Sequence, residues 1–164
     1  MKMQSTLIVN DELSLDKKYS LLGSQIRSLL NKEEPILSNL ANLTAALKQT
    51  FDKISWVGFY LYDGEKLFVG PFQGKVACTL IEIGKGVCGK AAELKKTVIV
   101  EDVSKFPGHI ACDPDSKSEI VVPIVKNGKL YAVLDLDSYQ LDAFGETDKQ
   151  YLEEYCKFLS SEII

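Results

Sequence analysis

Residues 120–138 read IVVPIVKNGKLYAVLDLDS and contain two apolar runs, 120–125 and 130–138, on either side of the pair Asn127-Gly128. An Asn-Gly pair favours the positive φ angles of a two-residue type I′ turn, so this stretch predicts a β-hairpin. Pro123 cannot donate a backbone hydrogen bond to a neighbouring strand. We therefore expect its strand to be an edge strand or to contain a bulge.

A second hairpin is predicted further upstream. Residues 55–61 are rich in aromatic and β-branched side chains and are followed by the turn pair Asp63-Gly64. Residues 67–69 would then return as the partner strand.

Helical periodicity flanks these strands on both sides. Apolar side chains recur at spacings of three and four in two segments near the start of the chain, the second after Pro35, and in one segment at the end. They are Tyr19, Leu22, Ile26, Leu29 and Leu30; Leu37, Leu40, Ala41, Thr44 and Leu47; and Leu152, Tyr155, Cys156, Leu159 and Ile163. The last helix would begin at Gly145 or with a capping box from Thr147 to Gln150. The pattern predicts an α+β fold with a mainly antiparallel central sheet covered by N- and C-terminal helices.

The 164 residues suit a single domain, and no repeat or Gly/Ser/Pro-rich linker divides them. We treat 1–164 as one domain, with 1–33 as an N-terminal helical extension and 34–162 as the main body. The composition, with 46% hydrophobic and 26% charged residues, is that of a globular protein and excludes a disordered chain.

Charge and hydropathy limit the possible partners. The 23 acidic residues outnumber the 19 basic ones, which argues against a nucleic-acid partner. No apolar run approaches the roughly 18 residues of a membrane span. The first 18 residues lack the basic start and apolar block of a secretory signal. We therefore expect a cytoplasmic protein with no membrane association.

The four cysteines differ in their sequence surroundings. In a reducing compartment permanent disulfides are uncommon, so thiol chemistry becomes the question. Cys112 lies among turn-forming residues in 106–115, and a loop can expose a reactive thiol. Cys156 falls on the apolar face of the last helix and is expected to pack there. Cys78 and Cys88, taken alone, are expected to be structural.

Two other cysteine chemistries are disfavoured. The spacings between the cysteines give no short chelating pair and His109 is the single histidine, so the sequence argues against zinc. His109 also lies three positions before Cys112, which admits a Cys/His hydrolase as a minor alternative.

The glycine-rich stretch 84–89, GKGVCG, matches a dinucleotide-binding motif between a strand-like segment, 78–83, and a helix-like one, 90–95. Such a site needs a βαβ unit and an acid about twenty residues later, which Glu101 or Asp102 would supply. The expected hairpins provide no βαβ unit, so this interpretation is disfavoured. A glycine turn leading into a helix still offers backbone N–H groups to a carboxylate or phosphate.

Two acids interrupt an otherwise apolar strand. Asp135 and Asp137 lie two residues apart and therefore on one strand face, within about 7 Å of each other. In a pocket, repulsion and burial would raise a carboxyl pKa and favour a cationic ligand or a shared proton. On a solvent-facing strand they would only add solubility. Trp56 and Tyr60 likewise share a strand face, as core residues or as the apolar wall of a pocket.

Seven short blocks between residues 36 and 160 together closely resemble the free methionine-(R)-sulfoxide reductase family, single-domain enzymes with the GAF fold. The blocks are 56–60, 70–74, 77–78, 86–89, 108–113, 118–121 and 134–138. The glycine block and the last strand resemble GAF domains in general, whereas Cys78, Cys88 and Cys112 separate the enzymes from sensor relatives. The alternative is a non-catalytic GAF domain that senses a small molecule.

The resemblance implies reduction of free L-methionine-(R)-S-oxide to L-methionine. Cys112 would be the catalytic thiol that becomes a sulfenic acid, and Cys78, or as second choice Cys88, would condense with it to a disulfide. Thioredoxin would then reduce the disulfide. No metal or organic cofactor is required, and family members commonly form homodimers.

The resemblance also implies a set of substrate contacts. Trp56 and Tyr60 would hold the S-methyl group. Glu119, Asp135 and Asp137 would bind the ammonium group and protonate the sulfoxide oxygen, and which acid does which stays open. Glu119 and Asp137 are the catalytic candidates among them. The substrate carboxylate would meet backbone N–H groups of the glycine turn or of the Cys112 loop, where Ile110 and Ala111 are expected contacts.

Overall fold

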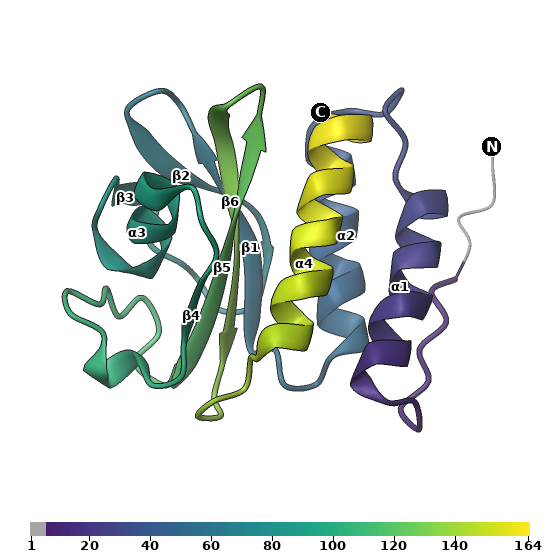
Figure 1. Cartoon of the computed structure of the whole chain (residues 1–164), viewed down its shortest axis with the longest axis horizontal. Helices are drawn as coiled ribbons and strands as arrows, with labels where there is room; N and C mark the ends of the chain where they lie inside the picture. Colours follow the sequence, from purple (N-terminus) through teal and green to yellow (C-terminus); the bar gives the residue numbers. More distant parts are fainter. Residues whose placement is uncertain (1–5) are drawn as a thin grey trace.

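The structure is a computed structural model that describes residues 6–164 (Figure 1). Its centre is one six-stranded sheet of order β3-β2-β1-β6-β5-β4, in which every pair of neighbours is antiparallel. The strands are β1 (Trp56–Tyr62), β2 (Lys66–Gln73), β3 (Leu80–Glu82), β4 (Val98–Val100), β5 (Ser118–Lys126) and β6 (Lys129–Ser138). Both predicted hairpins are present, and the antiparallel α+β prediction is confirmed.

The helices cover the sheet unequally. They are α1 (Leu15–Leu29), α2 (Ile36–Thr50), α3 (Gly86–Leu94) and α4 (Glu146–Phe158), with a short 3-10 turn at Val103–Lys105 and a π-helical turn at Leu159–Ile163 that continues α4. In Figure 1, α2 and α4 lie against one face with α1 outside them, and α3 lies on the opposite face. The three predicted terminal helices are confirmed. Among residues 6–164 no helix combines the length and the apolar character needed to cross a bilayer.

A buried polar network fastens α1 to the start of α4. The Tyr19 hydroxyl donates to Asp148 Oδ1 at 2.7 Å, and Lys53 Nζ donates to the same oxygen at 2.6 Å. The Gly145 N–H donates to Asp148 Oδ2 at 2.9 Å. The last helix therefore begins after Gly145, one of the two predicted starts, and the predicted capping box from Thr147 to Gln150 is wrong. Asp148 caps the helix instead, and its carboxylate also accepts hydrogen bonds from Lys53 and Tyr19.

The β5–β6 hairpin has the predicted turn. Asn127 and Gly128 have φ angles of 51° and 76°, both in the left-handed region that a type I′ turn requires. β4 pairs only with residues 119–121 of β5, so β5 is an edge strand at Pro123, and a register shift follows between Ile124 and Val125. The strand therefore has both predicted features, an edge position at Pro123 and an irregularity next to it.

Helix α3 begins earlier than the sequence predicts. The expected helix was 90–95, but the observed one starts at Gly86 and places Cys88 in its first turn rather than in a preceding loop. A Cβ atom on Gly89 would collide with the carbonyl oxygen of Glu82 at the end of β3. The glycines thus let α3 pack closely against the strand before it. Because the surrounding sheet is antiparallel, the βαβ unit of a dinucleotide site is absent from the described residues.

Candidate active site

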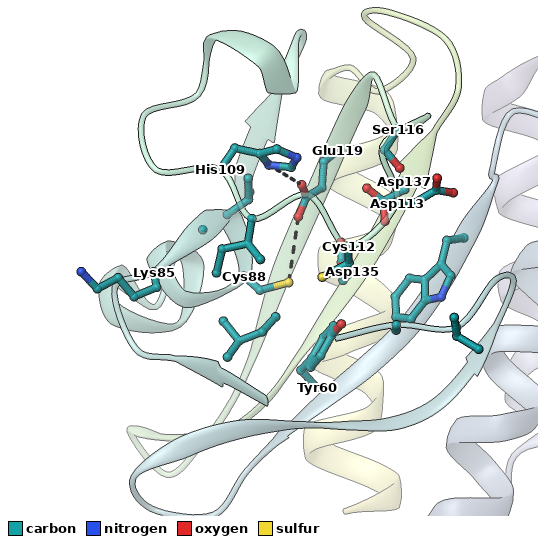
Figure 2. A pocket seen from close by; sticks show the side chains of 17 residues that line it. Tyr60, Lys85, Cys88, His109, Cys112, Asp113, Ser116, Glu119, Asp135 and Asp137 are labelled. Carbon is teal, nitrogen blue, oxygen red and sulfur yellow. Dashed lines mark hydrogen bonds and ion pairs between the residues drawn. The ribbon is translucent and has the colours of Figure 1, made fainter. Parts of the chain in front are cut away.

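A small pocket lies on the α3 face of the sheet, between β1, β5, β6, the start of α3 and two loops (Figure 2). One loop joins β2 to β3, and the other, residues 106–117, precedes β5. The cavity volume is about 40 Å³. The lining side chains that carry a thiol, an imidazole, a carboxyl or an aromatic ring are Trp56, Tyr60, Cys88, His109, Cys112, Asp113, Glu119, Asp135 and Asp137.

Aromatic rings from β1 form one wall of this pocket. The Trp56 and Tyr60 rings stack with centroids 5.9 Å apart, and Phe72 stacks on the other side of Trp56 at 5.4 Å. The Trp56 Nε1–H donates to the Lys75 carbonyl at 3.1 Å, which fixes the indole. Both interpretations of the aromatic pair hold, since Trp56 and Tyr60 are buried and also line the cavity.

Three carboxyl groups line the pocket from β5 and β6. Glu119 lies opposite Asp137 in the β5–β6 register, and Asp135 lies two residues before Asp137 on the same face. Glu119 and Asp135 are each 5% exposed. Oδ1 of Asp135 is buried and has no hydrogen-bond partner in the described chain. The prediction that both aspartates share one strand face is confirmed.

Burial and mutual repulsion change the acidity of this group. Loss of solvation raises the pKa of Asp135 to about 7. Burial, followed by repulsion from Asp135, raises the pKa of Glu119 and that of Asp137 well above the ordinary carboxyl range. At neutral pH the three groups therefore retain protons among them. Such a set can donate a proton or neutralise a bound cation.

Cys88 reaches the same pocket from the first turn of α3. Its Sγ lies 4.0 Å from Glu119 Oε1 (Figure 2). Burial, and then the charge of Asp135, raises the pKa of the Cys88 thiol well above its ordinary value. His109 Nδ1 lies 3.9 Å from Glu119 Oε2, and burial lowers the pKa of the imidazole. Cys88 is thus held as a neutral thiol rather than as a nucleophilic thiolate.

A disulfide joins the two loops at the pocket mouth. Cys78 in the β2–β3 loop is bonded to Cys112 in the loop before β5, with their Cα atoms 5.5 Å apart. Cys112 is exposed and Cys78 is half-buried. The other two cysteines, Cys88 and Cys156, are free and buried. Cys156 packs in the core between α4 and the sheet, as its helical spacing predicts.

The structure brings together most of the residues singled out from the sequence. The pocket lining includes Trp56, Tyr60, Cys88, Ile110, Cys112, Glu119, Asp135 and Asp137. Cys78 and Ala111 are outside the lining, Cys78 being connected through the disulfide and Ala111 being exposed.

Sequence reasoning overlooked a group of charged and polar loop residues. Asp113 lines the pocket and accepts hydrogen bonds from Lys75 Nζ at 3.1 Å and from the Tyr139 hydroxyl at 2.9 Å. Ser116 and Lys85 also line the cavity. The one available signal was that Lys75 and Asp113 lie beside the two loop cysteines, in segments with turn-forming residues.

The fold and the site define an α+β domain with a disulfide-forming cysteine pair at the mouth of a buried acidic pocket. A model of the GAF domain family matches residues 37–161. The chain belongs to the GAF domain family and, within it, to the free methionine-R-sulfoxide reductases, which are oxidoreductases.

Three relatives illustrate the relationship. The GAF domain-containing protein A of Dictyostelium discoideum is 52% identical over 149 residues, which are 90% of this chain and 94% of that protein. The free methionine-R-sulfoxide reductase of Saccharomyces cerevisiae is 48% identical over 133 residues, which are 78% of this chain and 74% of that protein. The crystal structure of the Neisseria meningitidis free methionine-R-sulfoxide reductase with its substrate has a TM-score of 0.88 and 45% identity, covering 94% of each chain.

Proposed function

We propose that this protein reduces free L-methionine-(R)-S-oxide to L-methionine, with Cys112 as the catalytic thiol. The observation that carries the proposal is the Cys78–Cys112 disulfide at the mouth of a pocket walled by aromatic rings and buried carboxyl groups. The relatives named as free methionine-R-sulfoxide reductases support the same substrate.

The first step transfers the sulfoxide oxygen to the protein. The Cys112 thiolate attacks the electrophilic sulfur while a pocket carboxyl protonates the sulfoxide oxygen, because that oxygen cannot leave as oxide. The oxygen then moves from the substrate sulfur to the Cys112 sulfur as the substrate sulfur–oxygen bond and the transient sulfur–sulfur bond break, so that methionine leaves and Cys112 becomes a sulfenic acid. The Cys78 thiol attacks this sulfenic acid, releasing water and forming the disulfide.

The buried carboxyl groups suit two tasks in this step. Glu119, Asp135 and Asp137 have raised pKa values, so a carboxyl that still holds its proton at neutral pH is available to the sulfoxide oxygen. The remaining negative charge attracts the substrate ammonium group, for which the unpartnered Oδ1 of Asp135 is a ready acceptor. Trp56 and Tyr60 give the S-methyl group an apolar wall.

The substrate carboxylate has a separate candidate position. Lys85, Gly86 and Val87 line the pocket at the beginning of α3, where backbone N–H groups and the helix dipole favour an anion. Ile110 also lines the pocket, and Ala111 follows it in the same loop. A peptide-bound methionine sulfoxide lacks both charges and would leave these groups buried without partners, which disfavours it.

Regeneration needs an external dithiol. We propose a thioredoxin-type protein as the reductant, because Cys112 is exposed and a thiolate can reach its sulfur for thiol–disulfide exchange. The cycle requires a compartment that keeps thiols reduced, which favours the cytoplasm. We further propose that the protein is a homodimer, which size-exclusion chromatography with light scattering would test.

The test is turnover of the purified chain with free methionine-(R)-sulfoxide and dithiothreitol. We expect methionine release by the parent protein, none above background by Cys112→Ser, and unchanged release by Cys156→Ser, which removes a buried cysteine away from the pocket. Free methionine-(S)-sulfoxide and an N-acetylated, amidated derivative serve as substrate controls. Equal turnover by the Cys112→Ser variant would exclude Cys112 as the nucleophile.

The alternative is a GAF domain that binds a small molecule without changing it. In that case the protein would bind the sulfoxide but release no methionine, and its mass after exposure to the sulfoxide without reductant would not change. The proposed reaction instead predicts that the reduced protein loses two hydrogen atoms as the disulfide forms.

A further inference from the structure

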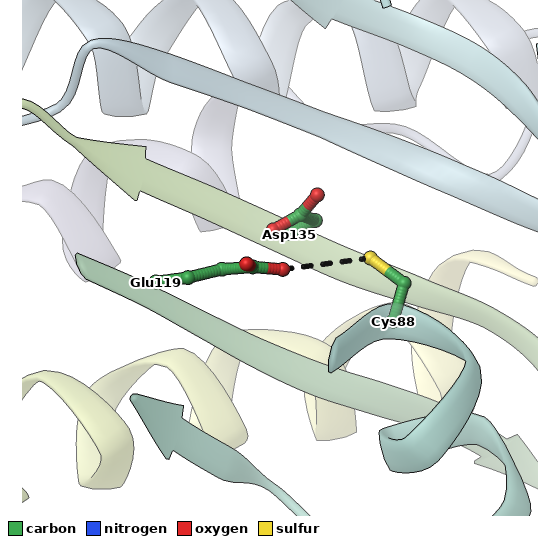
Figure 3. A group of neighbouring side chains, drawn as sticks. All are labelled: Cys88, Glu119 and Asp135. Carbon is green, nitrogen blue, oxygen red and sulfur yellow. Dashed lines mark hydrogen bonds between the residues drawn. The ribbon is translucent and has the colours of Figure 1, made fainter. Parts of the chain in front are cut away.

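Three side-chain atoms of kinds that can ligate a metal, from three different elements, lie close together (Figure 3), and their residues line the pocket. Cys88 on α3, Glu119 on β5 and Asp135 on β6 each offer one donor atom, and these atoms lie within 4.8 Å of one another. All three residues are buried, with exposures of 3%, 5% and 5%. The cluster combines a sulfur and two carboxylate oxygens rather than carboxylates alone.

A second observation points to a cation at this position. Oδ1 of Asp135 has no hydrogen-bond partner within the described residues, although the residue is 95% buried and lines the pocket. A buried acceptor left unpaired costs about 1–3 kcal/mol, so native structures pair such atoms with a donor, a water or an ion. Nδ1 of His109, on the other side of Glu119, is also without a partner. Two buried polar atoms without hydrogen-bond partners therefore lie beside the cluster.

The donor set selects the kind of cation. A thiolate with two carboxylates suits a borderline-soft divalent ion, whereas Mg²⁺ and Ca²⁺ prefer oxygen ligands only. Zinc bound tetrahedrally at about 2.3 Å to sulfur and about 2.1 Å to oxygen would hold the sulfur and an oxygen about 3.6 Å apart. The three atoms now lie within 4.8 Å of one another, so they would move together only modestly. The cavity of about 40 Å³ leaves room for the ion and a water as fourth ligand.

We propose that the disulfide form of this protein binds one Zn²⁺ ion through Cys88 Sγ, Glu119 and Asp135, with water in the fourth position. The Cys88 thiol proton is released to solvent as the zinc–sulfur bond forms, and no electrons are transferred. The site uses neither Cys78 nor Cys112, so the binding does not depend on the proposed reaction. Because Glu119 and Asp135 are also the proposed ammonium ligands, zinc that stays bound after the Cys78–Cys112 disulfide is reduced competes with substrate; this consequence alone rests on the proposed function.

The binding test uses the full chain in its disulfide form, where the free thiols are Cys88 and Cys156. Zinc chloride is titrated against a chromophoric chelator in the absence of thiol reductant, and Cd²⁺ is titrated separately to detect its ultraviolet thiolate charge-transfer band. We expect one ion per chain and the cadmium band in the parent protein. Cys88→Ser should abolish the band and weaken zinc binding at least about tenfold, while Cys156→Ser should retain both.

Carboxylate variants keep the proposal testable if Cys88→Ser does not fold, as judged by circular dichroism. Asp135→Asn and Glu119→Gln should each weaken zinc binding at least about tenfold. The matched control Glu65→Gln removes an exposed carboxylate in the β1–β2 turn and should not change binding. Absence of stoichiometric zinc binding in the parent, or undiminished binding in both pocket carboxylate variants, would overturn the proposal.

The two proposals fail in different ways. A protein that binds zinc with the stated variant pattern but produces no methionine supports the zinc site and overturns the reductase. A protein that turns over but binds no zinc overturns the zinc site alone. Where turnover is present, zinc should raise the KM for methionine-(R)-sulfoxide without lowering kcat, and a chelator should restore the original KM.

Discussion

Lys75 Nζ binds the Asp113 carboxylate at 3.1 Å and thereby connects the two loops that carry the disulfide cysteines. Lys75 also contacts Asp115 at 2.9 Å, and the Tyr139 hydroxyl donates to Asp113 Oδ2 at 2.9 Å. Asp113 is the residue directly after Cys112, and Lys75 lies three residues before Cys78. The contact thus joins the two sulfur-bearing segments beside the disulfide.

We expect Lys75→Met to weaken the Cys78–Cys112 disulfide relative to the dithiol form. The substitution keeps the aliphatic stem but removes the charge that joins the loops, so the two thiols meet less often. The equilibrium constant for disulfide formation against glutathione should fall about threefold, the modest size typical of exposed ion pairs. Lys149→Met, which breaks a similar ion pair with Glu146 on α4, is the control and should leave the equilibrium unchanged.

Removing the resolving thiol should trap the oxidised catalytic residue. In Cys78→Ser, one methionine is released per chain without reductant, and Cys112 keeps the oxygen as a sulfenic acid. Mass spectrometry should then show a gain of one oxygen and a dimedone adduct on Cys112, whereas the parent loses two hydrogen atoms and forms no adduct. If Cys78→Ser instead loses two hydrogen atoms, Cys88 is the resolving residue.

The sequence predicts the two hairpins of the sheet well because their strands carry local evidence, whereas β4 was not predicted. The two apolar runs and the Asn127-Gly128 turn act over a few positions, and they fix the β5–β6 hairpin without reference to the rest of the chain. The same locality explains why Asp135 and Asp137 could be placed on one face.

The start of α3 was misplaced because glycines weaken a helix signal when only local preference is considered. What fixes the helix is a tertiary contact, the close approach of Gly89 to the end of β3. The Lys75–Asp113 pair and the Cys88–Glu119–Asp135 cluster join residues many positions apart, and the fold alone makes them neighbours. The sequence argument against zinc used spacing along the chain, which does not show ligands contributed by separate elements such as those of the proposed site.

Gly89→Ala should lower the thermal stability of the protein. The added methyl group would collide with the Glu82 carbonyl, and α3 would have to move away from β3. Overpacking of this kind costs about 1–3 kcal/mol, which corresponds to a fall in Tm of about 5 °C for a domain of this size. Gly145→Ala is the matched control, because no atom lies within 4 Å of its added Cβ. Equal melting temperatures for the two variants would contradict the close-packing argument.

Stability should decrease as the pH rises from about 4 to about 7. The folded pKa of Asp135 is raised to about 7, whereas the unfolded chain releases this proton near its ordinary pKa of about 3.9. In that window the folded state binds more protons than the unfolded state, so its stability is lost with rising pH, and the penalty is complete above pH 7. Glu119 and Asp137, whose pKa values are also raised, act in the same direction.

Asp135→Asn removes part of that penalty. We expect its Tm to exceed that of the parent by about 3 °C at pH 8, the effect of roughly 1 kcal/mol, and to match it near pH 4. Asp142→Asn, at an exposed turn position, should follow the parent at both pH values. The opposite result would be a parent protein that is more stable at pH 8 than at pH 5 and an Asp135→Asn variant with a lower Tm than the parent. It would show that the folded protein stabilises the ionised form of Asp135.

The disulfide form should bind methionine sulfoxide poorly. Its cavity of about 40 Å³ has room for about three water molecules, each needing about 10–15 Å³ of this volume, and a whole amino acid is several times larger. The two loops that close the mouth are the ones that Cys78 and Cys112 join. Reduction releases this bond, so the loops can separate and admit substrate.

Trp56, the single tryptophan, lines the pocket and reports binding by its fluorescence. Titration with methionine-(R)-sulfoxide should give a Kd at least about tenfold lower for Cys112→Ser, which can form neither the disulfide nor product, than for the oxidised parent. The Cys156→Ser variant in its disulfide form should bind as weakly as the oxidised parent, because Cys156 lies in the opposite core. Equal affinities for the open and disulfide-bonded proteins would mean that the loops yield to substrate without reduction, and the pocket volume would then not control access.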